Sequence, residues 1–412
     1  MDTFQRAMND TLTMIMAGGR GERLYPLTKE RAKPAVTFGG IYKIIDFTLS
    51  NCLNSNIRRI YLLSQYSNAS LDKHIRLGWN IFNHELGEFI NTIPPQKINV
   101  DWWYRGTADS LFQNLNILER ERPRRVLILS GDHVYKMDYQ KMLEFHDNHA
   151  SDLTIACVEQ PLSEARSMGV LEVDENRRVI GFKEKPANPK HLAADPTKAL
   201  VSMGVYVFST EALVREIIFD AKRDTDHDFG KNIVPRMVKR SRVFAFTFTD
   251  TQGKASPYWR DVGSLDTYYA ANMELLEPHP VFDLYEEGWP IRTYQEQAPP
   301  AKIVMSAGAR NSGGMNVADS LISKGCVIYD SRVLRSILSP DVTVGQGAVI
   351  EDSIVMKGVT LGKGSRIRSC IIDEDIVIPS GYTIGSALAE DRKKFTVTEG
   401  GIVVVPQGSI ID

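Results

Sequence analysis

The chain has 412 residues, which at ~100–200 residues per domain leaves room for two to four domains. Hydrophobic residues make up 43% and charged residues 24% of the chain, and 49 Lys and Arg nearly balance 51 Asp and Glu. This composition excludes a largely disordered chain and gives no basic field for a general nucleic-acid binder. The longest apolar runs are shorter than a membrane span, and Met1–Asp10 has no apolar core of a signal peptide, so we expect a cytoplasmic protein without a membrane partner.

The first ~275 residues alternate apolar, strand-like runs with amphipathic stretches. This alternation predicts an α/β domain around a mostly parallel sheet, whose ligands bind where loops leave the carboxyl ends of the strands. Helices are expected at Ser110–Arg120 and Asp138–Asn148. The expected strands are Leu12–Ala17, Arg59–Leu63, Arg125–Leu129, Leu153–Val158, Val170–Val173, Gly204–Phe208 and Val243–Phe248.

The strongest local signal follows the first strand, in the segment MIMAGGRGERLYPLT and the nearby RAKPA. Glycines without side chains let backbone N–H groups approach an anion, and guanidinium groups suit phosphate oxygens. The segment therefore predicts a polyphosphate-binding loop. Its members are Gly18, Gly19, Arg20, Gly21 and Arg23, followed by Lys33.

Two familiar phosphate-binding motifs do not fit this loop. The P-loop pattern GxxxxGK[ST] is missing from the sequence. The dinucleotide pattern GxGxxG fails because Leu24 stands where its third glycine is required.

Asp132 follows the apolar strand that ends near Leu129, in the segment SGDH. A carboxylate at the carboxyl end of a strand is well placed to hold a hard cation at a ligand cleft. The residues alone leave a second interpretation equally open, namely that Asp132 caps the next helix.

A proline-punctuated stretch over residues 276–300 separates these elements from a repetitive C-terminal part, which begins near residue 301. There, aliphatic residues recur six apart, with occasional five-residue steps, between glycine-rich corners, the pattern of a parallel β-helix. The chain's last histidine is His279, so the repeats lack the base that acyltransferases of this repeat type commonly use. The repeat positions are Val327, Val333, Leu338, Val344, Ile350, Met356, Leu361, Ile367, Ile378 and Ile384.

The four cysteines lie far apart and form no CxxC pair. This spacing argues against a disulfide framework or a zinc ribbon and predicts buried thiols in a reducing compartment. They are Cys52, Cys157, Cys326 and Cys370.

The glycine-rich segment resembles the signature GGxGxRLxPLT…KP of the sugar-1-phosphate nucleotidylyltransferase family. Further stretches are similar to its bacterial glucose-1-phosphate adenylyltransferase (ADP-glucose pyrophosphorylase) branch, and they occur in family order. They are IIDFTLSNCLNS, WYRGTADS, LSGDHVY, FKEKP, SMGVYVF and YWRDVG.

This resemblance implies a Rossmann-like nucleotidyltransferase domain over residues 1–275, a linker over 276–300 and a left-handed β-helix over 301–412. It implies transfer of the adenylyl group of ATP to glucose 1-phosphate, with Mg²⁺ as cofactor. A homotetramer regulated by phosphorylated metabolites or nucleotides is also expected from it.

The resemblance also assigns roles to residues. Those expected to act in catalysis are Arg20, Arg23, Lys33 and Asp132. The nucleotide is expected at Ala17, Gly18, Gly19, Gly21 and Gln65, and the metal at Asp132 and Asp261. The sugar phosphate is expected at Tyr104, Gly169, Glu184, Lys185 and Ser202.

Two other functions stay open at this point. One is a sibling transferase that uses UTP, dTTP or GTP, or another sugar phosphate, because base choice does not follow from these residues. The other is a catalytically silent regulatory subunit, although the Arg, Lys and Asp positions are all present. The effector is also open: Arg31 and Lys43 remain, but Glu30 and Thr37 replace the Lys and His of the fructose-bisphosphate-activated type.

Overall fold

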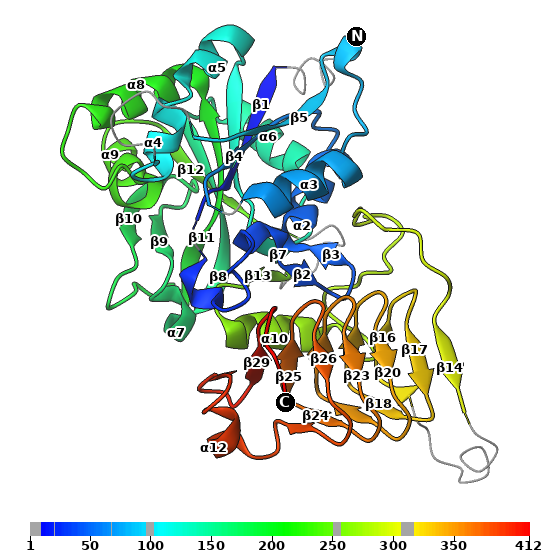
Figure 1. The fold of residues 1–412 in the computed structure, drawn as a ribbon. Coiled ribbons are helices and arrows are strands. Elements are labelled where there is room, and N and C mark those ends of the chain that lie inside the picture. Colours follow the sequence, from blue (N-terminus) through cyan, green and yellow to red (C-terminus); the bar gives the residue numbers. More distant parts are fainter. Residues whose placement is uncertain (1–9, 20, 67, 96–102, 250–256, 306–316) are drawn as a thin grey trace.

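The structure is a computed structural model of the chain. It describes residues 10–19, 21–66, 68–95, 103–249, 257–305 and 317–412. Figure 1 shows an α/β domain above a stack of short strands that forms the C-terminal domain.

The N-terminal domain is built on one mixed sheet with the strand order β10-β9-β11-β6-β1-β4-β5, while β8 pairs with β11 and β12. Strands β6, β1, β4 and β5 are mutually parallel, whereas β11 runs antiparallel to its neighbours β6, β8 and β9. The strands are β1 (Thr11–Ala17), β4 (Arg59–Ser64), β5 (Phe89–Ile93), β6 (Arg125–Ser130), β8 (Leu153–Pro161), β9 (Gly169–Val173), β10 (Val179–Glu184), β11 (Lys198–Ser209) and β12 (Val243–Thr247).

Helices cover both faces of this sheet because its strands are apolar on both sides. On β1, Ile15 packs into one buried cluster, with α2, α3 and α6, while Met14 packs into the other, with α4, α5, α8 and α9. The result is the Rossmann-like three-layer arrangement that the sequence predicts. The helices are α2 (Ile44–Asn54), α3 (Asn68–Gly78), α4 (Thr107–Phe112), α5 (Leu115–Glu121), α6 (Tyr139–Asn148), α7 (Leu162–Ala165), α8 (Thr210–Ala221), α9 (Val234–Val238) and α10 (Leu265–Glu274).

The prediction of a single helix at Ser110–Arg120 is wrong in one respect. The segment forms two separate helices, α4 and α5. Asn114 lies between them with φ −115° and ψ 21°. Its side-chain amide donates to the carbonyl oxygen of Ser110 at 2.8 Å and to the hydroxyl of Tyr104 at 3.1 Å. Such local side-chain bonds compete with helix continuation, which explains the break.

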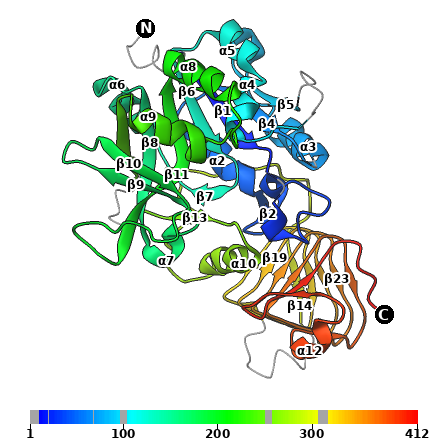
Figure 2. The ribbon, with the colours of Figure 1, turned by 90° about the vertical axis from the view of Figure 1, so that its left-hand side faces the viewer.

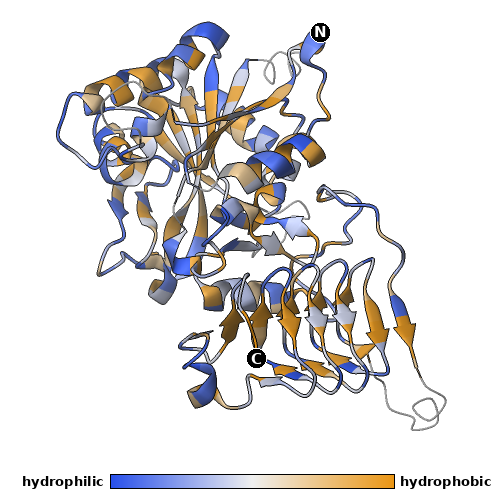
Figure 3. Cartoon of the chain, viewed as in Figure 1, coloured by the Kyte–Doolittle hydropathy of each residue, from blue (hydrophilic) through white to orange (hydrophobic). Residues whose placement is uncertain are grey.

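The C-terminal domain consists of three sheets around one apolar core, and their strands are parallel except for β28, which pairs antiparallel with β29. This arrangement confirms the predicted β-helix (Figures 1 and 3). Nine of the ten hexad positions are at most 1% exposed; at the tenth, Val327 is half-buried and its neighbour Ile328 is fully buried instead. One sheet holds β14 (Lys302–Val304), β17 (Val327–Tyr329), β20 (Thr343–Val344), β23 (Thr360–Leu361) and β26 (Val377–Ile378). The second holds β15 (Val317–Ala318), β18 (Arg332–Leu334), β21 (Val349–Glu351), β24 (Arg366–Arg368) and β27 (Thr383–Ile384). The third holds β16 (Leu321–Ile322), β19 (Ile337–Leu338), β22 (Ile354–Val355), β25 (Cys370–Ile372), β29 (Val403–Val405) and β28 (Thr396–Val397). The short helix α12 (Leu388–Asp391) comes between β27 and β28 in the sequence.

The two domains share a buried apolar cluster, in which Tyr268 of α10 and Ile371 of β25 both take part. Figure 2 shows α10 lying against the β-helix. The stretch that follows α10 has neither helix nor strand until β14, yet it is bound to the N-terminal domain: the indole of Trp289 donates to the side chain of Asn51 at 2.8 Å. The domain junction is therefore packed rather than loosely tethered.

All four cysteines are buried and free, as the sequence predicts. Among the described residues, no helix combines the length and apolar character that a membrane crossing requires.

Candidate active site

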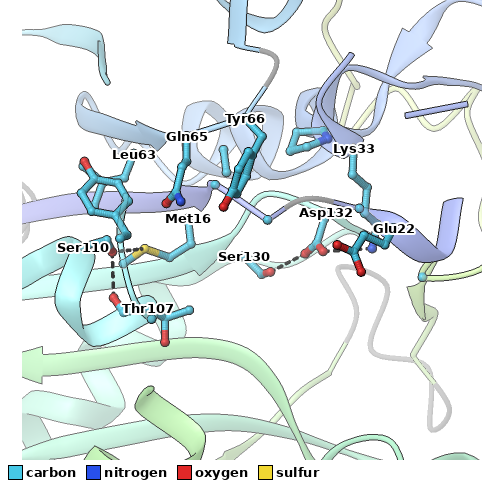
Figure 4. A pocket seen from close by; sticks show the side chains of 18 of the residues that line it. Met16, Glu22, Lys33, Leu63, Gln65, Tyr66, Thr107, Ser110, Ser130 and Asp132 are labelled. Carbon is cyan, nitrogen blue, oxygen red and sulfur yellow. Dashed lines mark hydrogen bonds and ion pairs between the residues drawn. The ribbon is translucent and has the colours of Figure 1, made fainter. Parts of the chain in front are cut away.

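A cavity of about 630 Å³, the main cavity of the predicted site, opens where β1, β4 and β6 end at the carboxyl edge of the sheet. Its lining includes the glycine-rich segment after β1 and the end of β4 at Gln65 (Figure 4). This is the edge at which α/β sheets bind ligands.

Gly21 shapes the glycine-rich segment. Its φ of 65° lies in the left-handed region that glycine adopts at little cost. A Cβ atom at this position would lie 3.0 Å from the Cβ of Lys33 and 3.0 Å from the Cγ2 of Thr28. The absence of a side chain at Gly21 therefore lets the segment fold directly over Lys33.

Lys33 is the electrostatic centre of the site. Its ammonium donates to the Asp132 carboxylate at 2.9 Å and to the Asp261 carboxylate at 3.1 Å, and the Lys33 side chain is only 7% exposed. Burial lowers the pKa of Lys33, but the two carboxylates together outweigh burial and raise it. For Asp132 the directions are reversed. Burial raises its pKa, but Lys33 and His133 together shift the pKa well below its usual range. Lys33 and Asp132 are therefore both charged at neutral pH.

The fold brings the two carboxylates together from distant parts of the chain. Asp132 follows β6, and the next residue begins β7 (His133–Tyr135), which pairs with β13 (Trp259–Asp261) so that His133 lies opposite Asp261. The hydroxyl of Ser130 donates to Asp132 (Figure 4), and the guanidinium of Arg23 lies 3.7 Å from Asp261. Strand pairing thus fixes the carboxylate pair.

The carboxylate group of the site, which consists of Asp132, His133 and Asp261, has donor atoms that fit a divalent cation. One ligand atom each from Asp132, His133 and Asp261 lies within 4.8 Å of the others. Carboxylate oxygens are hard ligands that suit Mg²⁺ and similar ions. The lowered pKa of Asp132 means that no proton has to leave this carboxylate before it accepts a metal.

A second group of residues expected to bind substrate lies where β9 pairs with β10. Gly169 is opposite Glu184 in this pair, and a Cβ at Gly169 would lie 2.9 Å from the Glu184 carboxylate. A Cβ at Gly230 would lie only 2.4 Å from the same carboxylate, so two glycines enclose Glu184. Burial and the nearby Asp228 raise the pKa of Glu184. A partly buried acceptor of this kind is suited to hydroxyl donors.

Lys185 differs from Glu184 in its exposure. Its side chain is 62% exposed, with the ammonium 3.9 Å from Glu184. Its φ of 44° is uncommon for a residue other than glycine. The backbone N–H of Lys185 donates to the carbonyl oxygen of Met168 at 3.0 Å, which holds this turn in place.

Ser202 lies on β11 at an irregularity in the pairing with β8, between Ser202 and Tyr206. Its hydroxyl donates to the phenol of Tyr206 and accepts from the backbone N–H of Gly204, both at 3.2 Å. A Cβ at Gly204 would lie 3.4 Å from the ring of His133, so this irregularity adjoins the carboxylate group.

The structure places the sequence-predicted residues in two sets. Lining the main cavity are Ala17, Gly18, Gly19, Gly21, Arg23, Lys33, Gln65, Tyr104 and Asp132. Asp261 reaches the same centre through Lys33, whereas Gly169, Glu184 and Lys185 form the neighbouring group. Ser202 lies at the β11 irregularity, where Gly204 approaches His133. Arg20 lies outside the described residues.

Sequence reasoning missed Asp228, which lines the main cavity and accepts a 3.0 Å hydrogen bond from Thr107. It also missed His133, whose ring packs edge-on against Trp259 at 5.0 Å between centroids. His133 adjoins Asp132 in the sequence, which is a usable signal. Asp228 follows no strand and stands in no recognised motif, so only the fold reveals it.

Two protein-family models match the chain and define the class of protein to which it belongs. The model of the family described as "Nucleotidyl transferase" matches residues 12–278, and that described as "GlmU-like, C-terminal hexapeptide" matches residues 299–405. Proteins of the first class generally use a divalent metal, which agrees with the carboxylate group.

Full-length relatives narrow the class. A protein of Rhodopirellula baltica named glucose-1-phosphate adenylyltransferase is 48% identical over 407 residues, 98% of this chain and 91% of the relative. One of Vibrio vulnificus (strain YJ016), named glucose-1-phosphate adenylyltransferase 2, is 49% identical over 97% of this chain and 99% of the relative. The chain belongs to the glucose-1-phosphate adenylyltransferase family.

The carboxylate group predicts how the protein binds a divalent cation. Asp132→Asn and Asp261→Asn should each weaken Mn²⁺ binding at least about tenfold, since each removes one charged ligand. Calorimetric titration of the folded variants with Mn²⁺ measures this effect. Asp72→Asn, which removes a carboxylate paired with Arg76 on the surface, is the matched control and should bind Mn²⁺ as the unchanged protein does. Unaltered affinity in both site variants would place the metal elsewhere.

Proposed function

We propose that this protein transfers the adenylyl group of ATP to α-D-glucose 1-phosphate, giving ADP-glucose and pyrophosphate. The observation that carries the proposal is the buried Lys33 held between Asp132 and Asp261 beside a glycine-rich segment. The names of the full-length relatives agree with this reaction. ADP-glucose is a glucosyl donor for α-glucan (glycogen-type) synthesis.

ATP is assigned to the main cavity. The glycine-rich segment and Arg23 lie beside Lys33 there, so backbone N–H groups and two cations can face the triphosphate. Gln65 contacts this segment, because a Cβ at Gly18 would lie 3.2 Å from the Cβ of Gln65. This position supports assigning Gln65 to the base, and Arg20 is assigned to the triphosphate by its place in the motif.

Glucose 1-phosphate is assigned to the group around Glu184. The Glu184 carboxylate accepts from sugar hydroxyls, while the Lys185 ammonium pairs with the phosphate. Tyr104, which lines the main cavity, and Ser202 of β11 are also assigned to the sugar phosphate. The two substrates then meet above the Asp132 carboxylate.

The reaction needs positioning and charge neutralisation more than acid–base chemistry. A phosphate oxygen of glucose 1-phosphate, already an anion near neutral pH, attacks the α-phosphorus of ATP. The bond from that phosphorus to the bridging oxygen breaks, and pyrophosphate leaves with the electron pair. Lys33 and Arg23 stabilise the negative charge that develops on the leaving group.

Asp132 and Asp261 are the residues that would hold Mg²⁺. Bound there, Mg²⁺ supplies Lewis-acid neutralisation of phosphate oxygens. The Lys33 ammonium pairs with both carboxylates and so orients them before the metal binds.

We also propose a homotetramer in the cytoplasm that responds to phosphorylated metabolites or nucleotides. The free, buried thiols agree with a reducing compartment, and the assembly and the effector class follow from the family. Light scattering should give the mass of four chains, and the mass of one chain would contradict the assembly.

The proposed reaction predicts nucleotide choice. With glucose 1-phosphate as co-substrate, ATP should give a higher kcat/KM than UTP, dTTP or GTP. A pyrophosphate-release assay with each nucleotide measures this choice. Equal or better turnover with UTP or dTTP would favour the sibling transferase, and no turnover with any nucleotide would favour a regulatory subunit.

The assignment of Lys185 predicts a selective effect on one substrate. Lys185→Ala removes a charge-assisted contact worth about 1.5–3 kcal/mol, so the KM for glucose 1-phosphate should rise roughly 10- to 150-fold. The KM for ATP should barely change, and Lys185→Arg should restore little, because a planar guanidinium does not replace a compact ammonium. Steady-state kinetics with each substrate varied in turn is the measurement.

Lys183→Ala is the control for Lys185, because Lys183 is an exposed lysine on β10, the strand that ends one residue before Lys185. It should leave both KM values unchanged. An equal rise in the two KM values of Lys185→Ala would show that the two phosphate sites are misassigned.

A further inference from the structure

A second cavity, of about 280 Å³, lies at the junction of the two domains. Arg31, Lys43 and Lys73 line it from the N-terminal domain, and Lys324 and Lys357 line it from the β-helix. Five cationic side chains around one small space would repel one another unless anionic groups neutralise them.

The β-helix supplies one such group in Glu374. A single carboxylate oxygen, Oε1, accepts from the Lys43 ammonium at 3.2 Å and from the Thr37 hydroxyl at 3.3 Å. The Arg31 guanidinium lies 3.4 Å from the same oxygen. Two cations and a hydroxyl converging on one anionic oxygen is also how proteins hold a phosphate oxygen.

The neighbouring Asp373 fixes this arrangement from behind. Its carboxylate pairs with Arg31 at 2.9 Å and accepts from the backbone N–H of Glu374 at 2.8 Å. Burial raises the pKa of Glu374, but Lys43 and Arg31 outweigh burial and lower it. Glu374 is therefore a full anion in the cavity at neutral pH.

Two cations of the cavity keep their charge available. Within the described part of the chain, neither Lys73 nor Lys324 forms an ion pair. A phosphate group in the cavity could pair with these lysines without displacing a carboxylate from them. It could gain Arg31 and Lys43 only by replacing Glu374.

We propose that Glu374 is a built-in anionic ligand of the junction cavity, which occupies Arg31 and Lys43 and so competes with phosphate-bearing ligands for them. Arg31 is two residues before Lys33, so the same short segment joins the cavity to the carboxylate group. Any effect of displacement on catalysis rests on the proposed function, whereas the competition itself does not.

Titration of the full-length protein with inorganic phosphate tests the competition directly. Glu374→Gln keeps an acceptor oxygen for Thr37 and Lys43 but removes the charge. Its affinity for phosphate, measured by calorimetry at constant ionic strength, should rise roughly tenfold. Glu351→Gln, which removes a carboxylate paired with Arg332 on the β-helix surface, is the matched control and should not change the affinity.

Two double variants locate the gain. Adding Lys43→Gln to Glu374→Gln should abolish it, whereas adding Lys185→Ala, at the proposed sugar-phosphate site, should leave it intact. Loss of the gain with Lys185→Ala, or its survival with Lys43→Gln, would overturn the assignment. Because phosphate binding is measured without turnover, failure here is distinguishable from failure of the proposed reaction.

Glu374→Asp keeps the charge but withdraws it by one methylene, and serves if Glu374→Gln does not fold. It should give a smaller gain in phosphate affinity. If Glu374 only ties the domains together, either variant lowers the melting temperature with phosphate affinity unchanged. That result would refute the proposal.

Discussion

The site depends on one buried ammonium held between two carboxylates. The three residues come from distant parts of the chain. Asp132 lies 99 residues after Lys33, and Asp261 lies 228 residues after it. Removing charges from water is costly unless they are paired, so each of these groups requires the others. The glycine at position 21, the β7–β13 pair and the end of β6 all serve to bring these charges into contact.

The same constraint links the β-helix to the site. Asp261 ends β13 and is followed by α10, whose Asp266 accepts a 2.6 Å hydrogen bond from Thr398 of the C-terminal domain. Lys33 follows Arg31, which the β-helix holds through Asp373. Both arms of the charge cluster are thus attached to the second domain, so a change at the junction has two short routes to the carboxylates.

The sequence predicts those features that depend on local patterns. Apolar runs identify the strands, because buried strands need them, and the six-residue period identifies the β-helix. The break at Asn114 escapes this reasoning because it depends on a side chain turning back to bond its own helix. The shift from Val327 to Ile328 escapes it because a one-residue change of register exchanges the inward and outward positions.

Within the site, motifs and family resemblance name most of the residues, but not their contacts. Asp228 belongs to no motif, and it reaches the cavity because the residues around it pack beside Thr107. Glu374 approaches Lys43 across 331 residues of sequence, and no local pattern encodes such a pairing. Long-range electrostatic partners of this kind require the structure.

Asp132 is assigned to the charge cluster that drives the reaction, and not to the cap of a helix. The most direct test is the kcat of Asp132→Asn for ADP-glucose synthesis, with folding checked by circular dichroism and with the surface variant Asp10→Asn as control. If Asp132 belongs to the charge cluster, the kcat of Asp132→Asn should fall about 100-fold or more, the scale of losing a key electrostatic stabiliser. Activity within about twofold of the unchanged protein, far below that scale, would contradict this assignment.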